Sequence, residues 1–173
     1  NAPDGLIGAL LGILATRIPT GEELFGACSI MNEFVHGVHL QGDRKDFLDT
    51  CGTGGAPKTF NVSTAAGIVL AASGVKIAKH GNRAASGRCG SADLLEAIGS
   101  NIELSPSSVE LCINDVNFGF MFAPLFHPAM KYAAPVRREL GIRTVFNMLG
   151  PLTNPAKARF QLLGVAEKSL GEK

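Results

Sequence analysis

The chain has 173 residues, enough for one domain or for parts of two, and 46% of them are hydrophobic. Its formal charge of +1 at neutral pH excludes a strong overall field for nucleic acid or membrane surfaces. The four cysteines show no CxxC spacing, which argues against a thiolate zinc site and indicates reduced thiols in the cytoplasm.

The first forty residues predict two helices. Apolar residues recur at helical spacing over 4–14, and Thr20 followed by two glutamates is typical of a helix start. We expect this second helix to run to about His36. A polar stretch at 41–45 then leads to a short strand at 47–49.

Residues 46–99 predict a βαβ unit. After the strand at 47–49, Asn61 or Ser63 caps a helix that ends near Gly74. A second strand is expected at 75–78, and a short helix at 91–98. This order of elements indicates a parallel sheet.

The remainder alternates helical and extended segments. Ser105-Pro106 predicts a helix over 106–115, and 128–140 reads as one helix. Residues 118–122 form an apolar run that Pro124 breaks. Residues 144–146 are expected to be extended, and 160–165 is expected to be a buried strand.

The predicted fold class is α/β, with a small helical domain beside a larger α/β domain that has a mainly parallel sheet. We expect helical residues 1–43, an α/β segment 44–104, a helical segment 105–140 that borders the cleft and returns to the helical domain, and a return to the α/β domain at 141–173. The chain starts without Met and stops just after a predicted strand, so a fragment is expected.

Two glycine-rich loops follow the two strands of the βαβ unit. The first contains Gly52-Thr53-Gly54-Gly55, and the second reads Lys79-His80-Gly81-Asn82-Arg83. Glycine lets backbone N–H groups approach phosphate oxygens, and a helix N-terminus adds partial positive charge. Neither loop matches a P-loop or GxGxxG, so a tight turn remains the alternative interpretation.

Several side chains near these loops have two interpretations. Ser63 is either a magnesium ligand or a helix cap. His80 is either a general base or a structural donor, and Arg83 either binds a polyanion or is a solvated charge. One of Arg137 and Arg138 is expected to bind a carboxylate, because consecutive helix residues point to different faces.

Five segments together resemble the anthranilate phosphoribosyltransferase family. In chain order they are Gly52-Thr53-Gly54-Gly55, Asn61-Val62-Ser63-Thr64, Lys79-His80-Gly81-Asn82-Arg83, Gly90-Ser91-Ala92-Asp93 and Arg143-Thr144-Val145-Phe146-Asn147-Met148-Leu149-Gly150-Pro151-Leu152-Thr153-Asn154-Pro155. The resemblance implies transfer of a phosphoribosyl group from phosphoribosyl pyrophosphate to anthranilate. It also implies a cytoplasmic homodimer that associates through the helical domain and binds Mg²⁺, with neither a membrane nor a nucleic acid as partner.

The resemblance also implies the roles of individual residues. Phosphoribosyl pyrophosphate would contact Gly52, Gly55, Ala56, Thr59, Asn61, Val62, Ser63, Thr64, Lys79, His80, Gly81, Asn82, Arg83, Ala84, Ala85, Ser86, Gly87 and Ser91. Anthranilate would contact Gly52, Asn82 and Arg137, with His80 and His127 lining its path. Ser63 would touch the metal, and Lys79, Asn82 and Arg137 would position the substrates and stabilise the transition state.

Two departures from the family pattern bear on the metal site. Ala56 stands where the family often has Asp, and the family's Asp-Glu metal pair lies further along than Lys173. Residues 1–173 alone are therefore expected to be inactive. A pyrimidine nucleoside phosphorylase-like enzyme and a non-catalytic nucleic-acid-binding paralogue remain as alternatives.

Overall fold

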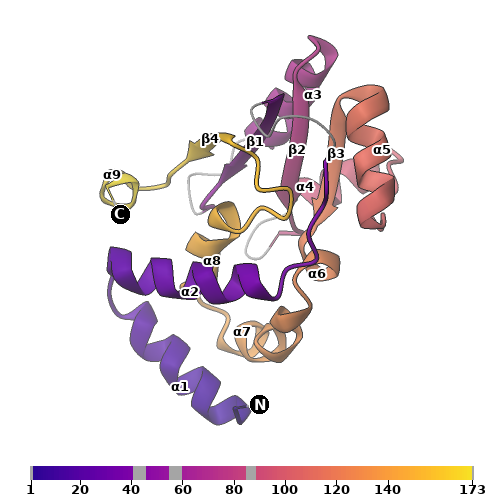
Figure 1. Ribbon diagram of the computed structural model, residues 1–173. Coiled ribbons are helices and arrows are strands. Elements are labelled where there is room, and N and C mark those ends of the chain that lie inside the picture. The colour runs from indigo at the N-terminus through magenta and orange to yellow at the C-terminus, as the bar shows by residue number, and fades with distance from the viewer. Residues whose placement is uncertain (1, 41–45, 55–59, 85–88, 173) are drawn as a thin grey trace.

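The computed structural model describes residues 2–40, 46–54, 60–84 and 89–172. A parallel sheet with helices on both faces lies beside a group of helices that contains both α1 and α2 (Figure 1). None of the helices in these ranges is long and apolar enough to cross a membrane.

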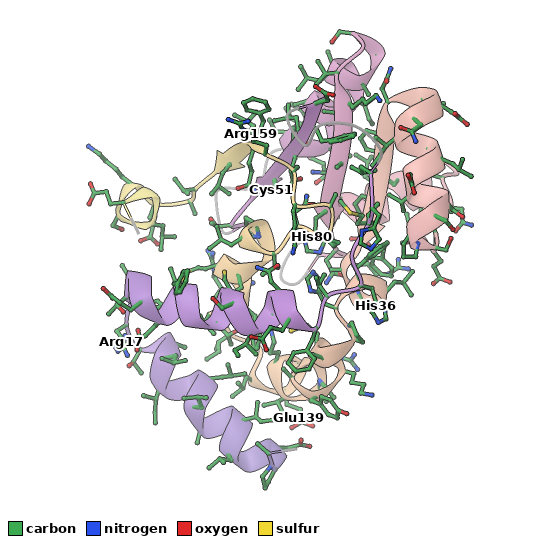
Figure 2. All side chains as sticks on the ribbon, viewed as in Figure 1. Arg17, His36, Cys51, His80, Glu139 and Arg159 are labelled. Carbon is green, nitrogen blue, oxygen red and sulfur yellow. The ribbon has the colours of Figure 1, made fainter. Side chains whose placement is uncertain are left out.

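The chain begins with α1 (Asp4–Ala15) and α2 (Gly21–Glu33). Thr20 caps α2 through a reciprocal pair of hydrogen bonds with Glu23, as its sequence predicts. Arg17, at the turn between the helices (Figure 2), donates two hydrogen bonds to the same carboxylate, at 2.7 and 2.6 Å. One glutamate therefore fixes both the start of α2 and the turn before it.

The sheet has four strands in the order β3-β2-β1-β4, and every pairing is parallel. The strands are β1 (Phe47–Gly52), β2 (Lys76–Gly81), β3 (Phe118–Phe122) and β4 (Phe160–Gly164). The predicted α/β class and parallel sheet are confirmed. Strand β2 runs three residues beyond its expected end at Ala78, so Lys79 and His80 lie on the strand and not in a loop.

Helices cover both faces of the sheet because side chains alternate along each strand. The helices α3 (Val62–Ala72) and α4 (Ser91–Ala97) pack on the face to which Ile77 and Phe120 point. Helix α5 (Pro106–Val116) packs on the other face, where Val109 and Ile113 meet Ala78. Residues 46–99 thus form the predicted βαβ unit.

After β3 the chain forms several short helices. They are α6 (Ala123–Phe126), the 3₁₀ helix η2 (Pro128–Tyr132), α7 (Ala134–Leu140), α8 (Phe146–Leu149), the 3₁₀ helix η3 (Gly150–Leu152) and, after β4, α9 (Lys168–Gly171). A second apolar core joins α1, α2, α7 and α8 through Leu11, Leu24, Val136 and Leu149.

The two-unit division of the chain stays a proposal. The contacts of α5 are with β3 and β2, whereas α7 contacts α1 and shares the second core. These contacts favour a boundary after β3 over the expected one at residue 104.

Several predicted elements were wrong in detail. Helix α2 ends before His36, whose backbone N–H instead donates to the carbonyl of Phe126 at 2.8 Å. The predicted helix 128–140 is two helices, because Pro135 lacks an N–H and begins a new first turn. Asn61 stands at the N-cap of α3, as one of the two predicted alternatives, but its side chain makes no capping hydrogen bond.

The last two extended segments also differ from the prediction. Residues 144–146 lead into helix α8, because Asn147 accepts a hydrogen bond from the Thr144 N–H at 2.9 Å and turns the chain. Strand β4 forms as expected, but its five residues are exposed and not buried. It pairs with β1 on one side, and the described helices leave its side chains uncovered.

Candidate active site

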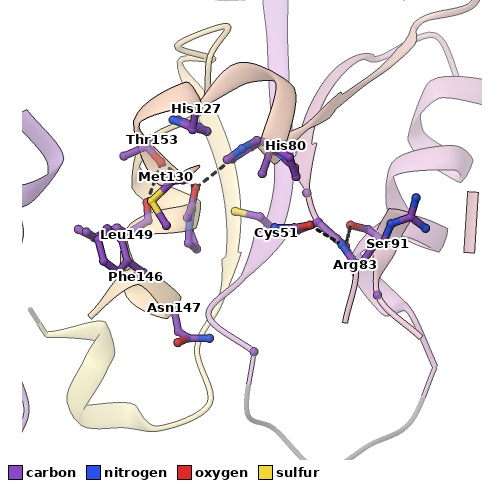
Figure 3. Close-up of a pocket in the computed structure, with 18 of the residues that line it drawn as sticks. Cys51, His80, Arg83, Ser91, His127, Met130, Phe146, Asn147, Leu149 and Thr153 are labelled. Atoms are coloured by element: carbon purple, nitrogen blue, oxygen red, sulfur yellow. Dashed lines mark hydrogen bonds between the residues drawn. The ribbon is translucent and has the colours of Figure 1, made fainter. Parts of the chain in front are cut away.

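One cavity of about 710 Å³ lies where the carboxyl ends of β1 and β2 meet α2, α7 and α8. Ligands in open α/β sheets bind at this edge, so the position agrees with the sequence-based expectation. Its wall brings together Cys51, His80 and Arg83 from the sheet side with Met130, Phe146 and Asn147 from the helices (Figure 3).

Lys79 is the most unusual charged residue of this wall, because only 1% of it is exposed. Its ammonium donates to the carbonyl of Thr50 and, at 3.3 Å, to the Ser63 hydroxyl. It forms no ion pair with a described carboxylate; burial lowers its pKa from the ordinary value, and the negative charge of the buried Asp49 opposes that shift only in part. A buried ammonium without a carboxylate partner is an attractive contact for an anion.

The first turn of α3 contributes the next group of polar contacts. Asn61 donates through its amide to the Gly90 carbonyl at 3.2 Å, so it joins the start of α3 to the start of α4. Ser63 and Thr64 face the cavity from the same turn, and the Thr64 hydroxyl is buried without a described partner. The partial positive charge of the helix N-terminus therefore points to the same space as Lys79.

Two histidines, His80 and His127, lie side by side with ring centroids 4.9 Å apart. Nδ1 of His80 donates to the Gly150 carbonyl at 3.1 Å, while Nε2 of His80 and both nitrogens of His127 are buried without a described partner. Burial lowers the pKa of each to about 4. Both rings are therefore neutral near pH 7, and the Nδ1 bond to Gly150 is a structural contact of the kind that the sequence offered as one interpretation of His80.

Arg137 supplies a second cation on the helical side of the cavity. It is half-buried, burial lowers its pKa, and its guanidinium lies 5.2 Å from the centre of the Phe146 ring. It makes no ion pair with a described carboxylate. Arg138 is exposed, so of the two consecutive arginines only Arg137 reaches the cavity.

Most of the described residues that the sequence assigned to the site line this one cavity. They are Gly52, Asn61, Ser63, Thr64, Lys79, His80, Gly81, Asn82, Arg83, Ser91, His127 and Arg137. Val62 and Ala84 do not line it, and Val62 is exposed. Gly55, Ala56, Thr59, Ala85, Ser86 and Gly87 lie outside the described residues.

Sequence reasoning missed most of the apolar wall. It consists of Met31, Ala123, Pro124, Pro128, Met130, Ala134, Phe146 and Leu149. Met31 comes from α2, and nothing in its own segment distinguishes it from a core methionine. Phe146 and Leu149 belong to the family segment 143–155, so the match to that segment could have indicated them.

The fold is α/β, and its cavity lies at the carboxyl ends of parallel strands. Residues 44–173 match the model of the glycosyl transferase family, a/b domain, and the chain belongs to this family. Within it, the chain is 54% identical, over its whole length, to the anthranilate phosphoribosyltransferase of Chloroflexus aurantiacus. The resemblance stated from the sequence motifs is confirmed.

Solved structures give the same result. The anthranilate phosphoribosyltransferase of Thermus thermophilus matches 97% of this chain with 47% identity and a TM-score of 0.87. The Saccharomyces cerevisiae enzyme, solved with phosphoribosyl pyrophosphate and magnesium, matches 87% with 37% identity and a TM-score of 0.79. The chain spans about half the length of the curated relatives it matches and 42–51% of these two structures.

Proposed function

We propose that the intact protein transfers the 5-phosphoribosyl group from phosphoribosyl pyrophosphate to the amine of anthranilate and releases pyrophosphate. The observation that carries this proposal is one cavity lined by the buried Lys79 on the sheet side and the half-buried Arg137 on the helical side, neither of which forms an ion pair with a described carboxylate. A polyanionic donor and a carboxylate-bearing acceptor match these two cations.

On the sheet side, the cavity suits the pyrophosphate. When the bond from C1 of the ribose to pyrophosphate breaks, positive charge develops on the sugar and negative charge on the leaving group. Lys79 and the N-terminus of α3 would stabilise that negative charge from fixed positions, which is a large term in such reactions. The amine lone pair forms the new bond to C1, and the amine then loses one proton to solvent.

On the helical side, the cavity suits an aromatic acid. Arg137 is held against Phe146 with its remaining donors available for a carboxylate, and Met31 and Met130 provide an apolar surface for the ring. Asn82 lines the same cavity between the two regions. An arylamine is already nucleophilic, so orientation would provide much of the remaining rate.

Magnesium would be coordinated jointly by the protein and the substrate. Groups of three or more His, Cys, Asp or Glu side chains that could hold a metal are absent from the described residues. Ser63 offers one hydroxyl, which lies 3.3 Å from the Lys79 ammonium. Mg²⁺ prefers oxygen ligands and keeps waters, so Ser63 would supply one ligand and the substrate phosphates others. The ion would neutralise pyrophosphate charge.

The intact protein is further proposed to be a cytoplasmic homodimer that associates through α1 and α2. Leu6, Leu10 and Ile13 are each 58–64% exposed on α1, and Phe25 is 76% exposed on α2. An apolar surface of this kind is typical of a subunit interface. Light scattering of the intact protein tests this, and a monomeric mass would contradict it.

Substituting Lys79 tests the donor side of the proposal. We expect Lys79→Met in the intact protein to raise the Kd for phosphoribosyl pyrophosphate at least tenfold, because a charge-assisted hydrogen bond contributes about 1.5–3 kcal/mol. Calorimetry in the presence of magnesium measures this Kd. Lys76→Met, half-buried at the other end of β2, is the matched control and should bind normally. Equal affinities for all three proteins would contradict the assignment.

A further inference from the structure

Two carboxylates of α4 hold the described ends of the basic loop, defined here as residues 82–84 and 89–90. Oδ2 of Asp93 accepts a hydrogen bond from the Gly90 N–H at 2.7 Å and another from the Ala84 N–H at 2.9 Å. The bond to Gly90 belongs to the start of α4. The bond to Ala84 is not part of the helix, so Asp93 also joins the two ends of the loop.

Glu96, three residues further along α4, holds the side chain of Arg83. Its Oε1 accepts from Nη2 of Arg83 at 2.8 Å, and its Oε2 accepts from Nη1. The same Nη1 lies 3.8 Å from Oδ1 of Asp93, and the guanidinium lies 5.3 Å from the centre of the Phe122 ring. Although Arg83 is about half exposed, it is fixed on three sides.

The two ends of the loop lie too close together for a side chain. A Cβ on Gly90 would lie 2.5 Å from the Ala84 nitrogen and 2.7 Å from the Asn82 oxygen. The Asn82 carbonyl accepts from the Ala92 N–H and the Ser91 hydroxyl, each at 3.2 Å. Since Asn82, Arg83, Gly90 and Ser91 line the cavity, the contacts that Asp93 organises set part of its wall.

We propose that Asp93 and Glu96 are positioning residues for the phosphate-bearing substrate. Neither carboxylate lines the cavity, so neither would touch the ligand. Asp93 fixes the backbone N–H groups of the loop, and Glu96 fixes the direction of the Arg83 guanidinium. This inference rests on the proposed function and extends it to residues that ordinary helix capping would not connect with substrate affinity.

The test uses steady-state kinetics and calorimetry on the intact protein. Asp93→Ala removes both backbone hydrogen bonds, and we expect it to raise KM and Kd for phosphoribosyl pyrophosphate about tenfold. KM for anthranilate should rise clearly less, because Asn82 is the only one of its assigned contacts that lies in this loop, and Arg137 is not held by this carboxylate. Asp93→Asn should restore most of the affinity, since one amide oxygen can accept the same two bonds.

Two more variants complete the design. Glu96→Ala should raise KM for phosphoribosyl pyrophosphate about threefold, because the Arg83–Glu96 pair is partly exposed and its contribution is screened. Asp115→Ala, on the exposed side of α5, makes the same charge change away from the loop and should match the wild type. If Asp93→Ala fails to fold, Asp93→Asn and Glu96→Ala decide the question.

The outcomes separate the two proposals. Equal increases in both KM values, or Asp93→Asn as weak as Asp93→Ala, would overturn the positioning role. So would a Glu96→Ala protein with wild-type KM values. If the wild type transfers no phosphoribosyl group, the proposed function fails, and calorimetry with inorganic pyrophosphate then tests positioning alone. An unchanged Kd for pyrophosphate in Asp93→Ala would overturn the positioning role.

Discussion

At the scale of single residues, the cavity contains a buried and a half-buried cation that form no ion pair with a described carboxylate. Arg17 and Arg83 have glutamate partners, whereas Lys79 and Arg137 have no described carboxylate partner. Lys79 and Arg137 both line the cavity. Burying part of a cation without a partner costs free energy, so its retention at this place is expected where a ligand supplies the counter-charge.

Arg137 gives the sharpest prediction for the acceptor. In the intact protein, Arg137→Ala should lower kcat/KM for anthranilate at least tenfold, which corresponds to about 1.4 kcal/mol of lost transition-state binding. The exposed neighbour Arg138→Ala is the matched control and should change it little. The reverse ranking, measured by steady-state kinetics, would show that the other arginine faces the acceptor.

The histidine pair predicts a pH dependence of stability. Burial lowers the pKa of His80 and His127 from 6.5 to about 4, so the unfolded chain binds more protons between these values. Their contribution to stability is complete above pH 6.5 and is lost as the pH falls towards 4. Urea unfolding of the intact protein at pH 7 and pH 5 measures this.

A substitution assigns the pH effect to the pair. His127→Leu should flatten the decrease in stability between pH 7 and pH 5, because one of the two protons is no longer taken up on unfolding. His39→Leu, at an exposed position, should leave the slope unchanged. Identical slopes for the wild type and His127→Leu would exclude this explanation.

At the scale of elements, the packing of α5 on β3 depends on Gly119. A Cβ at this position would lie 2.5 Å from Cγ1 of Ile113 and 2.9 Å from Cγ1 of Val109. Gly119→Ala should therefore cost about 1–3 kcal/mol of unfolding free energy through overpacking. Gly12→Ala on α1 meets nothing within 4 Å and should instead be neutral or stabilising by about 0.5–1 kcal/mol. Urea unfolding in which both variants behave alike would contradict this packing argument.

The elements also show how far sequence patterns reach. The βαβ unit was predictable because an apolar helix-length run, a glycine stop and an apolar strand act locally, as in 62–81. The α8 helix was not, because Thr144 and Val145 favour extended structure until the Asn147 side chain bonds back to the Thr144 N–H. The end of α2 was missed because the carbonyl that accepts from the His36 N–H belongs to Phe126, which lies far along the chain.

The same distinction holds for the site. Its polar half follows strands and glycine turns, so Lys79, Asn82 and Ser63 could be predicted from their own segments and the family motifs. Its apolar half is assembled from α2, α6, η2, α7 and α8, and α2, α7 and α8 pack together in the core around Leu24, Val136 and Leu149. Tertiary contacts of this kind leave no periodic mark, and Met31 could not be distinguished from a core residue.

At the scale of the whole molecule, the proposed activity needs both parts of the cavity wall at once. Lys79 and Ser63 belong to the βαβ unit, and Arg137 belongs to the helices that pack with α1 and α2. An arginine without an ion pair beside an apolar wall suits an aromatic carboxylate better than it suits nucleic acid, whose binding surfaces are lined by exposed cations. The central claim is therefore that both substrates occupy this one cavity.

The most direct test is a transfer assay on the intact protein with phosphoribosyl pyrophosphate, anthranilate and magnesium. We predict that anthranilate is consumed and that pyrophosphate appears in equal amount. Chelation of the metal and Arg137→Ala should each reduce the rate at least tenfold. Anthranilate left unchanged, with phosphate-dependent release of free base from a pyrimidine nucleoside instead, would contradict the account.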